Sequence, residues 1–200
     1  MEAYKAFLSR DTKGRQLLKN DIVIPQKTKS ITMSLVWSIL SQQISIQVAK
    51  VMHQRFLELL DGKIPKAEEI LKMPLPTIKA IGISQKKAEY IHHVAEFMVD
   101  KKVTFAKLNK MTDDEVIEFL TEIRGVGRWT VEMLLIFGLK REDVFALDDL
   151  GIQKAMITLF KLESLSKKDL REKMLKLSQR WSPYRTYVCL HMWKFSGFKP

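Results

Sequence analysis

Cysteine is almost absent from this chain of 200 residues, in which Cys189 is the only one. A single thiol cannot form a disulfide within the chain, and it cannot supply the cysteine cluster that holds zinc or an iron–sulfur cluster. Cys189 lies in an apolar stretch with helical spacing, so we expect it to pack in the core. We therefore expect an intracellular protein with no iron–sulfur cluster.

Long apolar runs and alternating patterns are also missing. No apolar run reaches the roughly 18 residues that a membrane-spanning helix needs, and the first 19 residues lack the apolar core of a signal peptide. No alternation of apolar and polar residues is long enough to predict a strand. Hydrophobic residues nevertheless make up 46% of the chain, enough for a real core. We expect an all-α protein with no membrane partner.

Acidic residues are outnumbered by basic ones. The chain has 34 Lys and Arg against 23 Asp and Glu, a formal net charge of +11. A polyanion is the natural partner of such a chain, and nucleic acid is the commonest polyanion. A basic surface that only aids solubility is the alternative, and charge alone does not separate the two.

Apolar residues recur every three to four positions along most of the chain, which predicts roughly eight to ten short helices. Ser, Thr and Asp residues mark the starts of several of them. Polar residues at 41–45 interrupt the first, so either two helices meet there or one helix carries a polar patch. Asp148 or Asp149 caps the helix that ends near Phe160. The expected ranges are 34–60, 67–73, 84–99, 112–121, 128–139, 149–160, 166–180 and from 182 onward.

Two glycines, Gly125 and Gly127, lie between two of the expected helices. Glycine permits positive φ and leaves backbone amides uncovered, and the following helix directs its N-terminus the same way. Such a helix-hairpin-helix binds a DNA phosphate without reading sequence. An ordinary turn between two helices is the alternative. The residues expected at the DNA backbone are Gly125, Val126, Gly127, Arg128 and Thr130.

About twenty residues further on, Asp148 and Asp149 follow an apolar segment and open a helix. With this second element the chain resembles the helix-hairpin-helix (HhH-GPD) DNA glycosylase superfamily, and within it the 3-methyladenine DNA glycosylase II branch. The resemblance runs from Ser34 to the C-terminus. The segments that carry it are residues 125–130 (GVGRWT), 143–149 (DVFALDD), 181–185 (WSPYR) with 191–193 (HMW), 41–45 (SQQIS) and 82–88 (GISQKKA).

The resemblance implies a two-lobed helical fold with the active site in a cleft between the lobes. Only 33 residues precede Ser34, too few for the β-rich N-terminal domain of some members. We therefore expect the compact form, a single glycosylase domain over residues 1–200 with the hairpin at about 113–139.

The resemblance also implies the catalytic group. Asp149 lies at the position of the superfamily's catalytic carboxylate, which stabilises oxocarbenium character on the sugar and orients or deprotonates the attacking water. Asp148 is then expected to be the helix cap. Relatives that also cut the strand carry a lysine where this chain has Trp129, so we expect a monofunctional enzyme.

Aromatic and polar side chains complete the implied site. The face of Trp129 suits a cationic alkylated base, and Trp193, Met133 and Trp37 are the other expected pocket residues. Gln42, Gln43 and Ile44 resemble the wedge that fills the gap left by a flipped nucleotide, with Gln43 preferred. The backbone carbonyls of Thr121, Ile123 and Val126 match the positions that hold a structural Na⁺ or K⁺ in the family. No cofactor is required.

These expectations combine into a base excision repair enzyme. It flips 3-methyladenine or 7-methylguanine out of duplex DNA, hydrolyses the N-glycosidic bond and leaves an abasic site. We expect a monomer that acts on DNA, in the cytoplasm and nucleoid of a bacterium or the nucleus of a eukaryote. Two alternatives stay open: a glycosylase for another lesion, and a non-catalytic helix-hairpin-helix DNA-binding protein. The second leaves Asp149 and the tryptophans unexplained.

Overall fold

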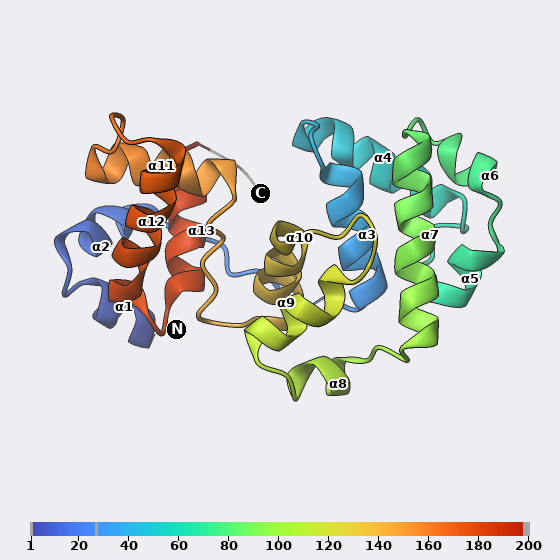
Figure 1. The fold of residues 1–200 in the computed structure, drawn as a ribbon, viewed down its shortest axis with the longest axis horizontal. Helices are drawn as coiled ribbons and strands as arrows, with labels where there is room; N and C mark the ends of the chain where they lie inside the picture. Colours follow the sequence, from blue (N-terminus) through green and yellow to red (C-terminus); the bar gives the residue numbers. More distant parts are fainter. Residues whose placement is uncertain (1, 27, 198–200) are drawn as a thin grey trace. The chain divides into compact units, whose positions relative to one another are not determined.

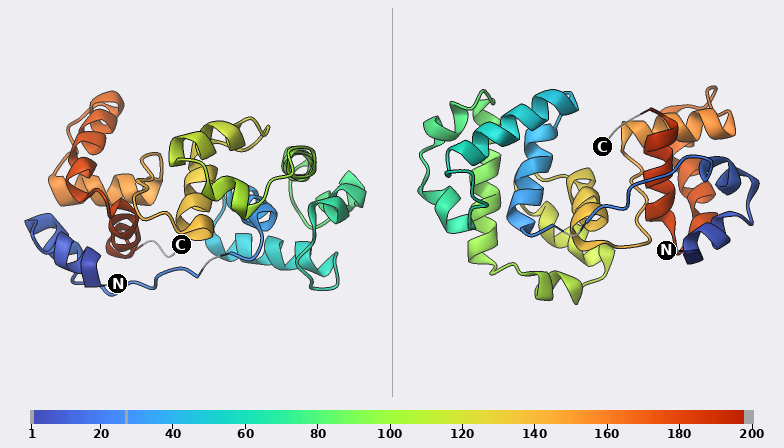
Figure 2. Two further views of the ribbon diagram at one scale, coloured as in Figure 1. Left: turned by 90° about the horizontal axis from the view of Figure 1, so that it is seen from below. Right: turned by 180° about the vertical axis from the view of Figure 1, so that it is seen from behind.

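Helices form all the regular secondary structure in the part of the chain that the structure describes, residues 2–26 and 28–197 of a computed structural model. The all-α expectation is therefore confirmed. The chain divides into two compact units (Figures 1 and 2). We call Gln26–Leu139 the central unit, and Met1–Pro25 with Lys140–Pro200 the terminal unit.

The central unit is built around its longest helix, α7 (Gln85–Asp100). This helix packs against α3 (Ile31–Ser41), α5 (Ala67–Lys72) and α6 (Leu75–Lys79), and α3 and α7 lie side by side in Figure 1. Helix α10 (Arg128–Met133) packs against α3 as well. The remaining elements are α4 (Ile46–Glu58), α8 (Phe105–Asn109), α9 (Asp113–Thr121) and the π-helical segment η1 (Leu134–Leu139), which continues α10.

The terminal unit is arranged around α13 (Arg185–Phe195), which packs against α2 (Thr12–Leu17) and α11 (Leu150–Phe160). Its other elements are α1 (Glu2–Leu8), α12 (Lys167–Ser178) and the 3-10 turn η2 (Gln179–Trp181). The sequence did not predict α1 and α2, because charged residues dominate that stretch. Tyr4, Leu8 and Leu17 are nevertheless buried in this unit.

Side-chain caps set most helix starts where the sequence predicts them. Ser84 caps α7, Ser166 caps α12, and Thr112 forms a capping box at α9. The predicted helix over 34–60 is two helices, with Ser45 capping the second. The last helix begins at Arg185 rather than at Ser182, because Ser182 has extended backbone angles and ends η2.

Within residues 2–26 and 28–197, no helix combines the length and the apolar character that crossing a bilayer requires.

Candidate active site

Asp149 is a buried, fixed carboxylate at the start of α11. Its side chain is 4% exposed. Its Oδ1 accepts hydrogen bonds from the backbone N of Ile152 at 2.9 Å and from Nε1 of Trp193 at 2.8 Å. Both donors belong to helices of the terminal unit, so the carboxylate is held by the packing of α11 against α13.

The expectation that Asp148 caps this helix is wrong, because Asp149 is the cap. An N-cap side chain bonds the amide two or three residues on, and the recorded bond joins Asp149 to Ile152. Asp148 instead pairs with Arg171 on α12 and is exposed. Capping and catalysis do not exclude each other at Asp149, because a carboxylate has two oxygens with roughly four lone-pair sites between them.

The segment that leads to Asp149 is tied to α13 along its length. The hydroxyl of Thr186 donates to the carbonyl oxygen of Arg141 at 2.6 Å and accepts from the backbone N of Val144 at 3.0 Å. Further along the helix, the Cys189 thiol lies 3.6 Å from the Val144 carbonyl oxygen, and Trp193 reaches Asp149. One helix therefore fixes residues 141–149, and the catalytic candidate stands at the end of that segment.

Asp143 anchors the beginning of the same segment. Its carboxylate accepts from Nε of Arg185 at 2.7 Å, from Nη2 of Arg185 at 2.9 Å and from Oγ of Ser182 at 2.7 Å. Burial raises the pKa of Asp143, but the hydrogen bonds from Arg185 and Ser182 outweigh it and hold the pKa below its usual value. Two of the resemblance-bearing motifs, 143–149 and 181–185, are thus one hydrogen-bonded structure.

The aromatic residues expected in the pocket lie on three helices. Trp193 on α13 is 1% exposed, and its indole N–H positions Asp149. Trp129 on α10 is half-buried, and Met133 one turn later is buried. Trp37 on α3 packs edge-on against the ring of His53, with 4.5 Å between the centroids. The pocket role of all four residues stays a prediction.

The hairpin has the expected helices, α9 and α10, but its two glycines differ. Gly125 has φ +96°, and a Cβ there would lie 2.1 Å from Cγ of Tyr90. Gly127 has φ −96°, an ordinary extended conformation, and a Cβ there would have no heavy atom within 4 Å. The expectation that both glycines serve positive φ is therefore wrong for Gly127. Gly125 makes the turn, and Gly127 leaves the space in front of α10 open.

The other residues expected to contact DNA divide by exposure. Arg128 is exposed, whereas the side chains of Val126 and Thr130 are buried, so these two can reach a partner only through the backbone. Nε of Arg128 lies 2.9 Å from Oε1 of Glu132, a buried carboxylate one turn later on α10. Sequence reasoning overlooked Glu132. Its signal is an acidic residue four positions after an arginine, inside an otherwise apolar helix.

The expected wedge occupies the loop between α3 and α4, which we call the wedge loop (residues 42–45). Nε2 of Gln42 donates to the carbonyl oxygen of Gly125 at 3.3 Å, so this side chain is turned toward the hairpin. Gln43 and Ile44 are exposed, and Gln43 has φ +58°. Both are more exposed than Gln42, which is only partly exposed. Gln43 and Ile44 line a hollow of about 270 Å³ together with residues that include Val48, Met52 and Gly82.

Lys87 and Lys86, adjacent at the start of α7, have different surroundings. Nζ of Lys87 donates to the carbonyl oxygens of Leu40 at 3.0 Å and of Gln42 at 2.9 Å. Burial lowers the pKa of Lys87. Lys86 is exposed. The sequence could not distinguish these two lysines, because the partners of Lys87 lie more than forty residues away along the chain.

The carbonyls expected to hold a monovalent cation follow α9 into the turn. Carbonyl oxygens are suitable donors for Na⁺ or K⁺, and the left-handed Gly125 reverses the chain between Ile123 and Val126. The Ile123 carbonyl already accepts from the Val126 amide at 3.0 Å, which leaves it a second lone pair. The role of these two carbonyls and that of Thr121 in holding a cation stays a prediction. In the described ranges no three His, Cys, Asp or Glu side chains gather as a metal site.

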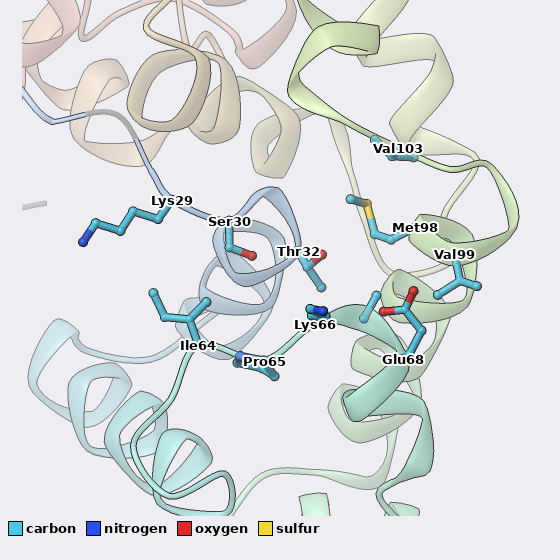
Figure 3. A pocket seen from close by; sticks show the side chains of 11 residues that line it. Lys29, Ser30, Thr32, Ile64, Pro65, Lys66, Glu68, Met98, Val99 and Val103 are labelled. Atoms are coloured by element: carbon cyan, nitrogen blue, oxygen red, sulfur yellow. The ribbon is translucent and has the colours of Figure 1, made fainter.

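A second hollow, of about 360 Å³, lies elsewhere in the central unit. Ser30 and Thr32 at the start of α3, Lys66 before α5 and Met98 near the end of α7 line it (Figure 3). None of the residues expected at the active site lines it. Its mixed polar and apolar walls therefore belong to the support of the fold and not to the candidate chemistry.

Comparisons with known proteins show which sequences and folds the chain is similar to. The chain is 35% identical over 164 residues to DNA-3-methyladenine glycosylase 1 of Schizosaccharomyces pombe, covering 81% of this chain and 71% of that protein. A Bacillus subtilis relative with the name "Putative DNA-3-methyladenine glycosylase YfjP" is 33% identical over 78% of this chain, which spans only 55% of that protein.

A solved structure of the Schizosaccharomyces pombe 3-methyladenine DNA glycosylase in complex with abasic DNA superposes with a TM-score of 0.87. It is 30% identical, and the match covers 98% of this chain and 97% of that one. The model of the HhH-GPD superfamily base excision DNA repair proteins matches residues 36–180. The chain therefore belongs to the HhH-GPD superfamily of base excision DNA repair proteins.

Proposed function

We propose that this chain is a monofunctional DNA glycosylase that removes alkylated purines from duplex DNA, with Asp149 as its catalytic carboxylate. The observation that carries the proposal is the buried carboxylate of Asp149, held through Oδ1 by the α11 amide of Ile152 and the indole of Trp193. Family membership and the relatives named as DNA-3-methyladenine glycosylases support the reaction and the class of lesion. The expected partner is duplex DNA carrying alkylated bases, bound by a monomer.

The reaction breaks the bond between C1′ of the sugar and the nitrogen of the base. The electron pair of that bond leaves with the base, and a cationic base such as 3-methyladenine departs as a neutral molecule. The positive charge left on the sugar is stabilised by the negative charge of Asp149. Water then forms a new bond to C1′, and Asp149 accepts its proton. The products are a free base and an abasic site.

Water, rather than an amine of the protein, is the nucleophile. The side chain at position 129 is an indole, which cannot form a Schiff base with the sugar. Trp129 offers an aromatic face, to which a cationic base is attracted by about 0.5–2 kcal/mol. The enzyme therefore releases the base without cutting the strand.

DNA contacts come from the hairpin and the wedge loop. Gly127 and Arg128 are exposed and approach a phosphate through a backbone amide and a positive charge. A monovalent cation held by the carbonyls of Thr121, Ile123 and Val126 would add positive charge at the hairpin. The exposed Gln43 and Ile44 fill the gap left by the flipped nucleotide. The net charge of +11 provides further attraction that does not depend on sequence.

The test is release of methylated bases from alkylated duplex DNA, resolved by base identity. The proposal predicts free 3-methyladenine and 7-methylguanine and an equal amount of abasic sites. Release confined to oxidised or mismatched bases from other duplexes would make the enzyme a glycosylase for another lesion. DNA binding with no base release from any of these substrates would leave a non-catalytic DNA-binding protein.

A further inference from the structure

One face of α7 contacts both loops that the proposed function directs to DNA. Lys87, Tyr90 and His93 recur every three residues, so they lie along one stripe of the helix. Lys87 binds the wedge loop, and the ring of Tyr90 lies against Gly125 in the hairpin. Nδ1 of His93 is 3.4 Å from the carbonyl oxygen of Arg124. Helix α7 therefore sets the position of the wedge loop relative to the hairpin.

The contact of Lys87 has a specific electrostatic basis. The last carbonyls of a helix have no intrahelical partner and form its negative end. Lys87 places its ammonium group against two carbonyls at the end of α3, those of Leu40 and Gln42. Three donors on a compact cation allow it to bind both oxygens at once. The charge of this partly buried lysine is thus bonded to the protein's own backbone.

Gln42 is consequently held from two sides. Its carbonyl oxygen accepts from Lys87, and its side-chain amide donates to the carbonyl of Gly125. The next residue, Gln43, has φ +58°, a left-handed conformation that is unfavourable for a residue with a Cβ. A loop in this conformation needs fixed neighbours, since relaxation would turn Gln43 and Ile44 to new directions.

We propose that Lys87 is a positioning residue for base flipping: by fixing the wedge loop, it directs Gln43 and Ile44 into the gap left by the flipped nucleotide. This inference rests on the proposed function, because it assigns Lys87 to the flipping step of that reaction. The recorded hydrogen bonds of Lys87 go to backbone carbonyls at the end of α3. Its effect is therefore on excision from paired DNA rather than on binding or on the chemistry at C1′.

The experiment compares Lys87→Met with Lys86→Met, which removes the same charge from the exposed neighbouring position. Single-turnover excision of 7-methylguanine is measured in two duplexes, one with cytosine opposite the lesion and one with an abasic analogue opposite it. The second duplex has no base pair to break, so flipping costs less and depends less on the wedge. Affinity is measured on an uncleavable abasic duplex.

The proposal predicts that Lys87→Met slows excision of the paired lesion on the order of 10- to 100-fold, as expected when a loop shifts by about 1 Å. The loss should shrink to a fewfold opposite the abasic analogue, with affinity within a fewfold of wild type. Lys86→Met should match wild type on both duplexes. An equal loss on both duplexes, or no difference between the two variants, would overturn the proposal.

Lys87→Arg separates positioning from folding. It keeps a cation that donates to carbonyl oxygens, so we expect it to restore most of the excision of the paired lesion. If Lys87→Met is unfolded by circular dichroism, the arginine variant decides: a folded Lys87→Arg with the same loss on both duplexes refutes the positioning role. A wild-type enzyme that excises neither substrate would count against the proposed function itself, and this outcome is distinct from the others.

Discussion

Separate alanine substitutions at Gly125 and Gly127 should affect different properties, although the two residues share one turn: Gly125→Ala should lower stability, and Gly127→Ala should weaken DNA binding. Gly125→Ala places a side chain in the left-handed region, which costs about 1–2 kcal/mol for an L residue. The new Cβ would also lie 2.1 Å from Cγ of Tyr90, so the ring or the turn must move. Overpacking of this kind costs about 1–3 kcal/mol.

The two costs at Gly125 add to about 2–5 kcal/mol, a large part of the 5–15 kcal/mol that stabilises a typical domain. For a chain of this size the melting temperature should fall by about 4–20 °C. Gly127→Ala meets neither obstacle, because φ is −96° and no heavy atom lies within 4 Å of the new Cβ. Its free energy of unfolding should stay within about 1 kcal/mol of wild type.

The assays are thermal unfolding and equilibrium binding to an abasic-analogue duplex. Gly127→Ala should melt normally and bind DNA more weakly, because its methyl group occupies the space where a phosphate approaches the amide. Gly125→Ala should melt early. Equal melting temperatures for the two variants, or unchanged DNA affinity of Gly127→Ala, would refute the division of roles between the glycines.

Three further outcomes follow from the site. Trp193→Phe removes the indole donor to Asp149 and should slow single-turnover base release on the order of 10-fold with DNA affinity unchanged. Trp181→Phe is an equally buried control in the same unit whose indole bonds Asp11, and it should leave base release unchanged. Equal losses in the two variants would mean that Trp193 acts only through packing. Borohydride should trap no covalent adduct of the enzyme with DNA during turnover, since position 129 is tryptophan. Efficient trapping would refute the monofunctional mechanism. DNA affinity should fall steeply with salt, with each phosphate neutralised contributing about −0.9 to the slope of log K against log salt; a flat dependence in a titration would contradict phosphate binding.

Local signals in the sequence placed most of the helices of the fold. Ser84, Thr112 and Ser166 begin helices as expected, because capping depends on residues three positions apart. Helices α1 and α2 were not predicted, because their few apolar residues show no clear helical pattern in the sequence. These residues are recognised as core only once the helices pack within the terminal unit. The predicted start of the last helix at Ser182 was wrong for a similar reason. The hydroxyl of Ser182 donates to Asp143, which is distant along the chain.

The candidate site was predictable in its residue types but not in its connections. The family resemblance points to Asp149 as the catalytic residue, which stays a prediction. The cap was wrongly assigned to Asp148, because a shift of one residue decides which side chain meets the Ile152 amide. Long-range partners have no local signal. The bond of Trp193 to Asp149 and the contact of Lys87 with Leu40 join residues more than forty positions apart, and only the packing of the helices brings them together.

The central claim is that the carboxylate of Asp149 drives base release, and the most direct measurement is single-turnover release of 7-methylguanine by Asp149→Asn and Asp148→Asn. Asparagine keeps an oxygen that can accept from the Ile152 amide and the Trp193 indole, so the cap and the fold should survive while the negative charge is lost. The account predicts a loss of roughly 100-fold or more for Asp149→Asn, with DNA affinity retained, and near wild-type release for Asp148→Asn. Release near wild type by Asp149→Asn, with Asp148→Asn inactive, would contradict it.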